Sequence, residues 1–173
     1  DKLVATRNVT DEDPPRLLQF DDEPAEAVGV AVDQAIEGLA STVMSPWRME
    51  LGRTGEGATV INDAYNANAI STEAALRSLA AIDAAQRFAV LGVMAELGDR
   101  HDADHQAMAA LCDELNIRLI AFEEPAYGVE PVEDFDGAIA KLGALSRDVA
   151  ILIKGSRVAG LEALAARLLD PPS

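Results

Sequence analysis

Three segments of the chain are apolar along almost their whole length, and helical patterns separate them. They read RFAVLG at 87–92, IRLIAF at 117–122 and VAILIK at 149–154. A strand with one face in water alternates apolar and polar residues, whereas a strand covered on both faces is apolar throughout. Such strands alternate with helices when right-handed crossovers build a parallel sheet with helices on both faces. We therefore predict an α/β fold with a Rossmann-like, mostly parallel sheet.

The remaining elements are predicted from helical spacing and turn residues. A turn at 54–57 should join strands at 47–51 and 58–62 into a hairpin. Ser71 is a plausible N-cap because hydroxyl side chains often accept a hydrogen bond there. The expected helices lie at 72–84, 102–115, 135–145 and 158–168.

Residues 1–46 show a different pattern from the rest of the chain. Acidic, proline-bearing loops there surround a weak strand at 2–9 and a helical pattern at 25–40. One strand and one helix cannot bury a core of their own. We therefore divide the chain into residues 1–46, either a packing appendage or the end of a neighbouring domain, and residues 47–173, the α/β domain.

Acidic residues dominate the charge of the chain. It has 30 Asp and Glu against 14 Lys and Arg, with a formal net charge of −16. Such a chain repels phosphate backbones and anionic lipids, so we expect neither a nucleic-acid nor a membrane partner. No signal peptide opens it, and the single cysteine, Cys112, excludes a disulfide within the chain. We expect a cytoplasmic monomer with Cys112 buried.

A polar loop follows the predicted strand at 58–62 and leads into the next helix. Ligands of open α/β sheets bind outside the carboxyl ends of the strands. Asp63 can accept hydrogen bonds from ribose hydroxyls, and Asn66 and Asn68 can both donate and accept. In a hairpin, Arg48 could approach Asp63, so that an arginine for phosphate and an aspartate for ribose address one ATP. The alternative is an Asx-rich loop that only makes turns and caps the helix.

A second polar loop, Lys154-Gly155-Ser156-Arg157, follows the strand at 149–154. Two cations and a hydroxyl at the N-terminus of a predicted helix favour a carboxylate or phosphate. The alternative is that Lys154 and Arg157 pair with the many surface acids. We predict no catalytic residue, because the loop at 92–99 has no nucleophile and base in array. We predict no metal ligand, because the helical pair His101 and His105 has Asp102 where a zinc motif has glutamate.

Loops after successive strands together resemble the Mur ligases, the ATP-dependent amide-forming enzymes of peptidoglycan synthesis. The residues that carry the resemblance are RME at 48–50, VINDAYNAN at 60–68, VLGVMAELG at 90–98, His105 and IKGSR at 153–157. The chain departs from the family at Ala69, where proline is usual, and at Val93, where aspartate is common. The resemblance covers about residues 47–169 and implies the family's C-terminal Rossmann-like domain, which closes over a central ATP-binding domain.

The resemblance also implies an activity and its site. In the family, ATP and Mg²⁺ phosphorylate an acceptor carboxylate, and an amine then attacks the acyl phosphate. The chain looks most like the branch that adds D-alanyl-D-alanine to UDP-N-acetylmuramoyl-tripeptide. Contacts to the nucleotide are implied for Arg48, Asp63, Tyr65, Asn66 and Asn68, and contacts to the incoming dipeptide for Lys154, Ser156 and Arg157.

Other parts expected of the family have no counterpart in this sequence. These parts are the UDP-sugar domain, the phosphate-binding loop, the metal-binding glutamate and the carbamylated lysine. We therefore expect a C-terminal domain with a remnant of the central domain at 1–46, inactive by itself. The alternatives are a sister ligase, such as folylpolyglutamate synthase, and a stand-alone nucleotide- or amino-acid-binding module.

Overall fold

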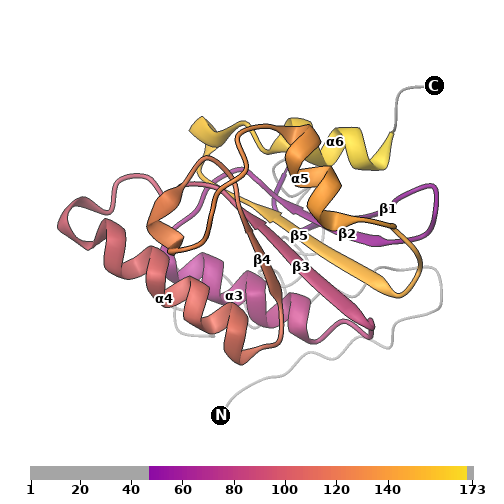
Figure 1. Ribbon diagram of the computed structural model, residues 1–173, viewed down its shortest axis with the longest axis horizontal. Helices are drawn as coiled ribbons and strands as arrows, with labels where there is room; N and C mark the ends of the chain where they lie inside the picture. The colour runs from indigo at the N-terminus through magenta and orange to yellow at the C-terminus, as the bar shows by residue number, and fades with distance from the viewer. Residues whose placement is uncertain (1–46, 171–173) are drawn as a thin grey trace, which may run out of the picture. The chain divides into compact units, whose positions relative to one another are not determined.

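The computed structural model describes residues 47–170, through which a five-stranded sheet runs. The strands lie in the order β1-β2-β5-β3-β4, and β1 alone among them is antiparallel to its neighbour (Figure 1). The predicted mostly parallel α/β sheet and its hairpin are confirmed. The bounds of the strands are β1 (Glu50–Arg53), β2 (Thr59–Asp63), β3 (Gln86–Leu91), β4 (Arg118–Ala121) and β5 (Val149–Lys154).

Helices cover both faces of the sheet. Helices α3 (Ala69–Ala80) and α4 (His101–Glu114) lie on one face, and α5 (Phe135–Leu142) and α6 (Glu162–Leu169) lie on the other (Figure 1). Successive residues of β5 divide between these two layers, because side chains along a strand alternate in direction. None of the helices within 47–170 has the length and apolar character that crossing a membrane requires.

All four predicted helices have different bounds, although α4 differs by only one residue at each end. The helix expected from residue 72 begins at Ala69, because Asn68 rather than Ser71 caps it. The Oδ1 atom of Asn68 accepts from the Ser71 N–H at 2.8 Å, and the Ser71 hydroxyl oxygen accepts from the Asn68 N–H at 3.2 Å. The helix expected to reach residue 145 ends at Leu142, because Gly143 follows with a φ of 70°.

The last helix also begins later than predicted. A 3₁₀ turn, η3 (Arg157–Ala159), follows the second polar loop, and Gly160 then takes a φ of 63°. Helix α6 therefore starts at Glu162 rather than at residue 158. The strand and helix expected at 2–9 and 25–40 lie outside the described residues, and the division of the chain at residue 47 stays a prediction.

The four parallel strands end in one row. Asp63 of β2 lies opposite Lys154 of β5, which lies opposite Leu91 of β3, which lies opposite Ala121 of β4. Parallel neighbours in register point to the same face, so the side chains of Asp63 and Lys154 share the face that α3 and α4 cover. This row places the two polar loops side by side.

Candidate functional site

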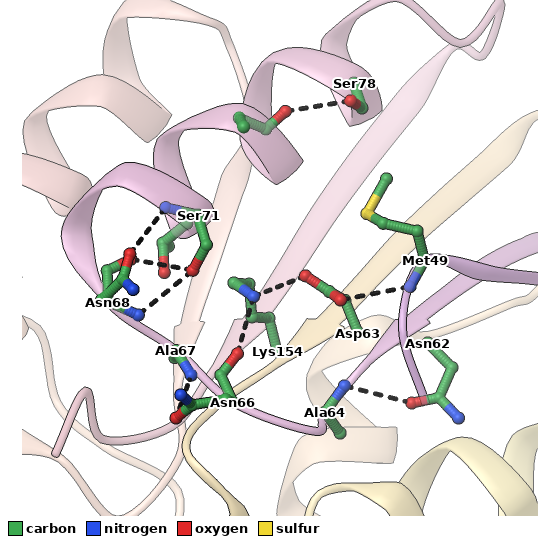
Figure 2. Close-up of polar contacts among 12 residues, drawn as sticks. Met49, Asn62, Asp63, Ala64, Asn66, Ala67, Asn68, Ser71, Ser78 and Lys154 are labelled. Carbon is green, nitrogen blue, oxygen red and sulfur yellow. Dashed lines mark hydrogen bonds and ion pairs between the residues drawn. The ribbon is translucent and has the colours of Figure 1, made fainter. Parts of the chain in front are cut away.

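A buried ion pair lies at the carboxyl edge of the sheet (Figure 2). Lys154 is 2% exposed, and its Nζ lies 2.5 Å from the Oδ2 atom of Asp63. The same Nζ donates to the Asn66 carbonyl at 2.8 Å, and the Oδ1 atom of Asp63 accepts from the Met49 N–H at 3.1 Å. Removing an ammonium from water is costly unless a partner compensates, and Asp63 provides that partner. Lys154 therefore joins β5 to the loop after β2.

The hairpin brings the residues before β1 against the loop after β2. The Tyr65 N–H donates to the Trp47 carbonyl at 3.1 Å, and the Arg48 guanidinium lies over the Tyr65 ring, 4.1 Å from its centroid. Trp47 and Met49 have positive φ values of 63° and 49°. Large side chains are uncommon in that conformation, which recurs at functional sites. Arg48 and Asp63 thus share this corner of the sheet, as the sequence predicts, although each contacts a different neighbour.

The asparagines of the loop also have structural partners. The side-chain oxygen of Asn66 accepts from the Ala67 N–H at 2.9 Å, and Asn68 caps α3. Asn66 and Asn68 therefore do make a local turn and cap a helix, as the alternative interpretation of this loop predicts. Both side chains are nevertheless exposed. A nucleotide role for them stays a prediction that these local bonds do not prevent.

Ser156 is bonded to two other loops. Its side chain is buried, and its Oγ accepts from the Ala95 N–H at 2.8 Å and donates to the Ala67 carbonyl at 3.3 Å. Its backbone N–H donates to the Val93 carbonyl at 2.8 Å. One serine thus connects the segments that follow β2, β3 and β5.

The helix N-terminus predicted directly after Lys154 is corrected by the structure, because the turn η3 separates the loop from α6. An anion site in this loop stays a prediction. The pairing of Lys154 with a surface acid is also wrong, because its acid is Asp63. Arg157, in contrast, is exposed, and its guanidinium lies 5.7 Å from the centroid of the Trp47 ring. Lys154 is therefore buried and paired with an acid, whereas Arg157 is exposed to solvent.

His105 of the histidine pair belongs to a buried hydrogen-bonding unit. The Nδ1 atom of His105 lies 2.7 Å from the His101 carbonyl, which can only accept, so Nδ1 carries the proton. The Nε2 atom then accepts from the Met94 N–H at 2.9 Å. Together with Glu124, these histidines are the residues within 47–170 that come close enough to share a metal. The lone pair that a metal would need on His105 is already used, so we assign no metal there.

Tyr127, which holds the segment after β3, was not predicted from the sequence. The Tyr127 hydroxyl donates to the Gly92 carbonyl at 2.9 Å, beside the bond from Met94 to His105. Burial of Tyr127 raises the pKa of its phenol, which keeps that hydroxyl a donor. The burial of His105 was detectable, because it lies at helical spacing from Met108 and Cys112. The partner of Tyr127 had no comparable signal.

Comparison with known proteins agrees with this architecture. Residues 47–157 match the family described as "Mur ligase, glutamate ligase domain". The UDP-N-acetylmuramoyl-tripeptide–D-alanyl-D-alanine ligase of Mycobacterium tuberculosis (strain CDC 1551 / Oshkosh) is 37% identical, over 82% of this chain and 34% of the relative. The enzyme of that name from Escherichia coli (strain K12) is 30% identical, over 79% of this chain and 32% of the relative. The chain thus spans about a third of the length of these relatives.

Solved structures give the same result for the fold. The MurF ligase of Thermotoga maritima, solved in complex with ADP, superposes with a TM-score of 0.69 at 22% identity, over 85% of this chain and 35% of that one. MurF of Acinetobacter baumannii gives a TM-score of 0.68 at 25% identity, over 84% and 34%. The family match covers well over half of the sequence, and the fold agrees with it. The chain belongs to the Mur ligase family.

Proposed function

We propose that this chain is the C-terminal domain of an ATP-dependent ligase that adds D-alanyl-D-alanine to UDP-N-acetylmuramoyl-tripeptide through an acyl phosphate. The observation that carries the proposal is the row of polar loops at the carboxyl edge of β2 and β5, in a chain whose relatives bear that enzyme's name. Open α/β sheets bind ligands at this edge. The part described here is proposed to need the rest of such an enzyme for turnover.

The nucleotide is proposed to lie against the hairpin side of this edge. Arg48 offers a guanidinium that can meet phosphate oxygens while it stacks on Tyr65. Asp63 keeps lone pairs for a ribose hydroxyl, because each carboxylate oxygen can accept more than one hydrogen bond. Asn66 and Asn68 add exposed amides beside it. ATP would supply the phosphoryl group that activates the acceptor carboxylate.

Within residues 47–170, the group of His, Cys, Asp or Glu side chains close enough to share a cation is His101, His105 and Glu124, which holds one carboxylate. Asp63, the acid nearest the proposed nucleotide contacts, is paired with Lys154 and with the Met49 N–H. Mg²⁺ prefers an octahedral shell of oxygens, often completed by phosphates and water. We therefore derive no step through the metal in this domain.

The incoming dipeptide is proposed to place its carboxylate at Arg157. This guanidinium is exposed at the same edge and can donate two parallel hydrogen bonds to a carboxylate. The Trp47 ring beneath it supports its orientation. We further propose that the protein works as a monomer in the cytoplasm, where its one cysteine, buried Cys112, stays a thiol.

A chimera tests this function. Residues 47–170 would replace the matching third of the Escherichia coli relative, and phosphate release would be measured with ATP, UDP-N-acetylmuramoyl-tripeptide and either D-alanyl-D-alanine or D-glutamate. We expect phosphate release when D-alanyl-D-alanine is the amine and none when D-glutamate is the amine. Turnover with D-glutamate would instead indicate a sister ligase, and a folded chimera that releases no phosphate with either amine would contradict the proposal.

Arg157→Ala in that chimera should raise KM for the dipeptide with a smaller effect on KM for ATP. The expected loss is on the order of tenfold or more, because a charge-assisted bond to a carboxylate is removed. Arg77→Ala is the control: Arg77 is an exposed arginine in the last turn of α3, paired with Glu73. Equal effects of the two substitutions would contradict the assignment of Arg157.

A further inference from the structure

We propose that Lys154 and Ser156 are positioning residues, which set the backbone of the loop Asn62–Asn68 from β5 and do not contact the dipeptide. The proposal rests on the proposed function only for the identity of the ligands. It divides the segment Lys154–Arg157, the last residue of β5 and the three residues after it, between two tasks. Arg157 meets substrate from the surface, and the two buried side chains hold the neighbouring loop from beneath.

The surroundings of Lys154 argue against direct contact with a substrate anion. Its ammonium already donates to Asp63 and to the Asn66 carbonyl, and its side chain is 2% exposed. A dipeptide carboxylate at Nζ would displace Asp63 or place two carboxylates on one ammonium in a site with little water. Either change leaves an acid poorly compensated. An anion arriving at this edge therefore meets Arg157 first.

The hydroxyl of Ser156 is occupied in the same way. A serine has one proton to donate, and here it goes to the Ala67 carbonyl. The oxygen accepts from the Ala95 N–H, and the residue is 4% exposed. Replacing these partners with substrate would leave the buried Ala67 carbonyl and the partly buried Ala95 N–H without bonds, and an unsatisfied buried polar group costs about as much as a new hydrogen bond returns.

The two side chains act on adjacent peptides of one loop. Lys154 holds the carbonyl of Asn66, and Ser156 holds the carbonyl of Ala67. Figure 2 shows Lys154 pointing to both Asp63 and Asn66 from β5. The exposed side chains of Asn66 and Asn68 are on either side of these peptides, so their directions depend on how the carbonyls are held. The nucleotide contacts are thus preorganised from a different strand.

The test compares Lys154→Met with Arg157→Met in the full 173-residue chain. Both variants replace one cation of the same loop with the same residue, so their net charge is equal. Backbone ¹⁵N relaxation should show increased mobility at residues 65–68 in Lys154→Met and wild-type values in Arg157→Met. The strands β3 and β5 should keep their wild-type amide shifts in both. A loop as ordered in Lys154→Met as in wild type would overturn the proposal.

Ligand titrations of the same samples add a second measurement. Lys154→Met should weaken ADP binding on the order of ten- to a hundred-fold, through lost loop order, and leave the shifts caused by D-alanyl-D-alanine in place. Arg157→Met should do the reverse. Loss of the dipeptide shifts in Lys154→Met with ADP affinity unchanged would show direct contact and would also overturn the proposal.

The test still decides the proposal if Lys154→Met fails to fold or if the wild-type chain binds no ligand. If Lys154→Met does not fold, Ser156→Ala carries the relaxation test, because it removes one oxygen without removing a charge. Increased mobility at residues 65–68 is again expected, and wild-type order would again contradict the positioning role. A wild-type chain that binds neither ADP nor the dipeptide would count against the proposed function, and the relaxation comparison would still decide the role of Lys154.

Discussion

Gly92 is required for its size rather than for its conformation. A Cβ built there would lie 2.8 Å from the Cβ of Ala159 and 3.0 Å from the Cδ1 of Leu161. A Cβ built on Gly155 would lie 3.3 Å from the Cα of Gly92. The backbones after β3 and β5 can therefore approach each other only because both positions lack a side chain.

Gly92→Ala should lower the free energy of unfolding by about 1–3 kcal/mol, because inserting a methyl group into a packed region forces backbone or side-chain shifts. Urea denaturation followed by circular dichroism measures this. Gly55→Ala is the control, because a Cβ there would meet nothing within 4 Å. A urea midpoint for Gly92→Ala equal to that of the control would mean that the backbones after β3 and β5 are packed less tightly than these distances indicate.

The residue types of the site were readable from the sequence, but their environments were only partly so. Asp63 and Arg157 could be chosen because polar side chains at strand ends form sites in this fold class. Lys154 was expected to face a ligand, yet it is the last residue of VAILIK, a run that is otherwise apolar throughout. That continuous apolar run was a signal of burial on either face. Its partner Asp63 was not predictable, because 91 residues separate the two in sequence.

At the scale of elements, helix existence was predictable and helix ends were less so. Asn68 and Ser71 are both good capping residues, and the sequence could not say which occupies the N-cap, because a capping box uses both. Gly143 and Gly160 end or delay helices through positive φ values. Glycine permits that conformation without requiring it, so only the tertiary packing decides.

Helix α4 provides a test of pH dependence. Asp104 is 6% exposed, and hydrogen bonds from the Arg100 guanidinium, the nearer at 2.6 Å, lower the pKa of its carboxyl. A carboxyl whose folded pKa lies below its unfolded value stabilises the fold above that unfolded value, about 3.9, and loses this contribution as pH falls through the folded pKa. Wild type should therefore lose more stability than Asp104→Asn between pH 7 and acid.

Thermal midpoints of the two proteins at a series of pH values check this. Asp102→Asn serves as the control, because Asp102 is exposed on the first turn of the same helix. Parallel curves for wild type and Asp104→Asn would mean that the Arg100 contact does not persist in solution.

At the scale of the whole molecule, the class of fold followed from composition of the strands, whereas their order did not. The alternation of apolar strands with helices implies a parallel sheet, and the two layers of helices follow from burial on both faces. The place of β5 between β2 and β3 depends on side-chain fit across long sequence separations. Lys154 and Asp63 meet only when β5 lies beside β2. Because the strand order could not be predicted from the sequence, this ion pair could not be predicted either.

The central place of β5 also constrains how the molecule can be made. It is the last of the strands in the chain, yet it is the one that joins β1-β2 to β3-β4. Until Val149–Lys154 has left the ribosome, β5 cannot pair with β2 and β3. The β1-β2 hairpin and the β3-β4 pair therefore cannot yet join into one sheet. A nascent chain ending before residue 149 should therefore be cleaved rapidly by a protease, whereas one ending at residue 173 resists it. Comparable resistance of both would mean that half-sheets are stable alone. If the prediction holds, the carboxyl edge that carries the two polar loops forms in one step, once Val149–Lys154 has been synthesised and can pair with both halves of the sheet.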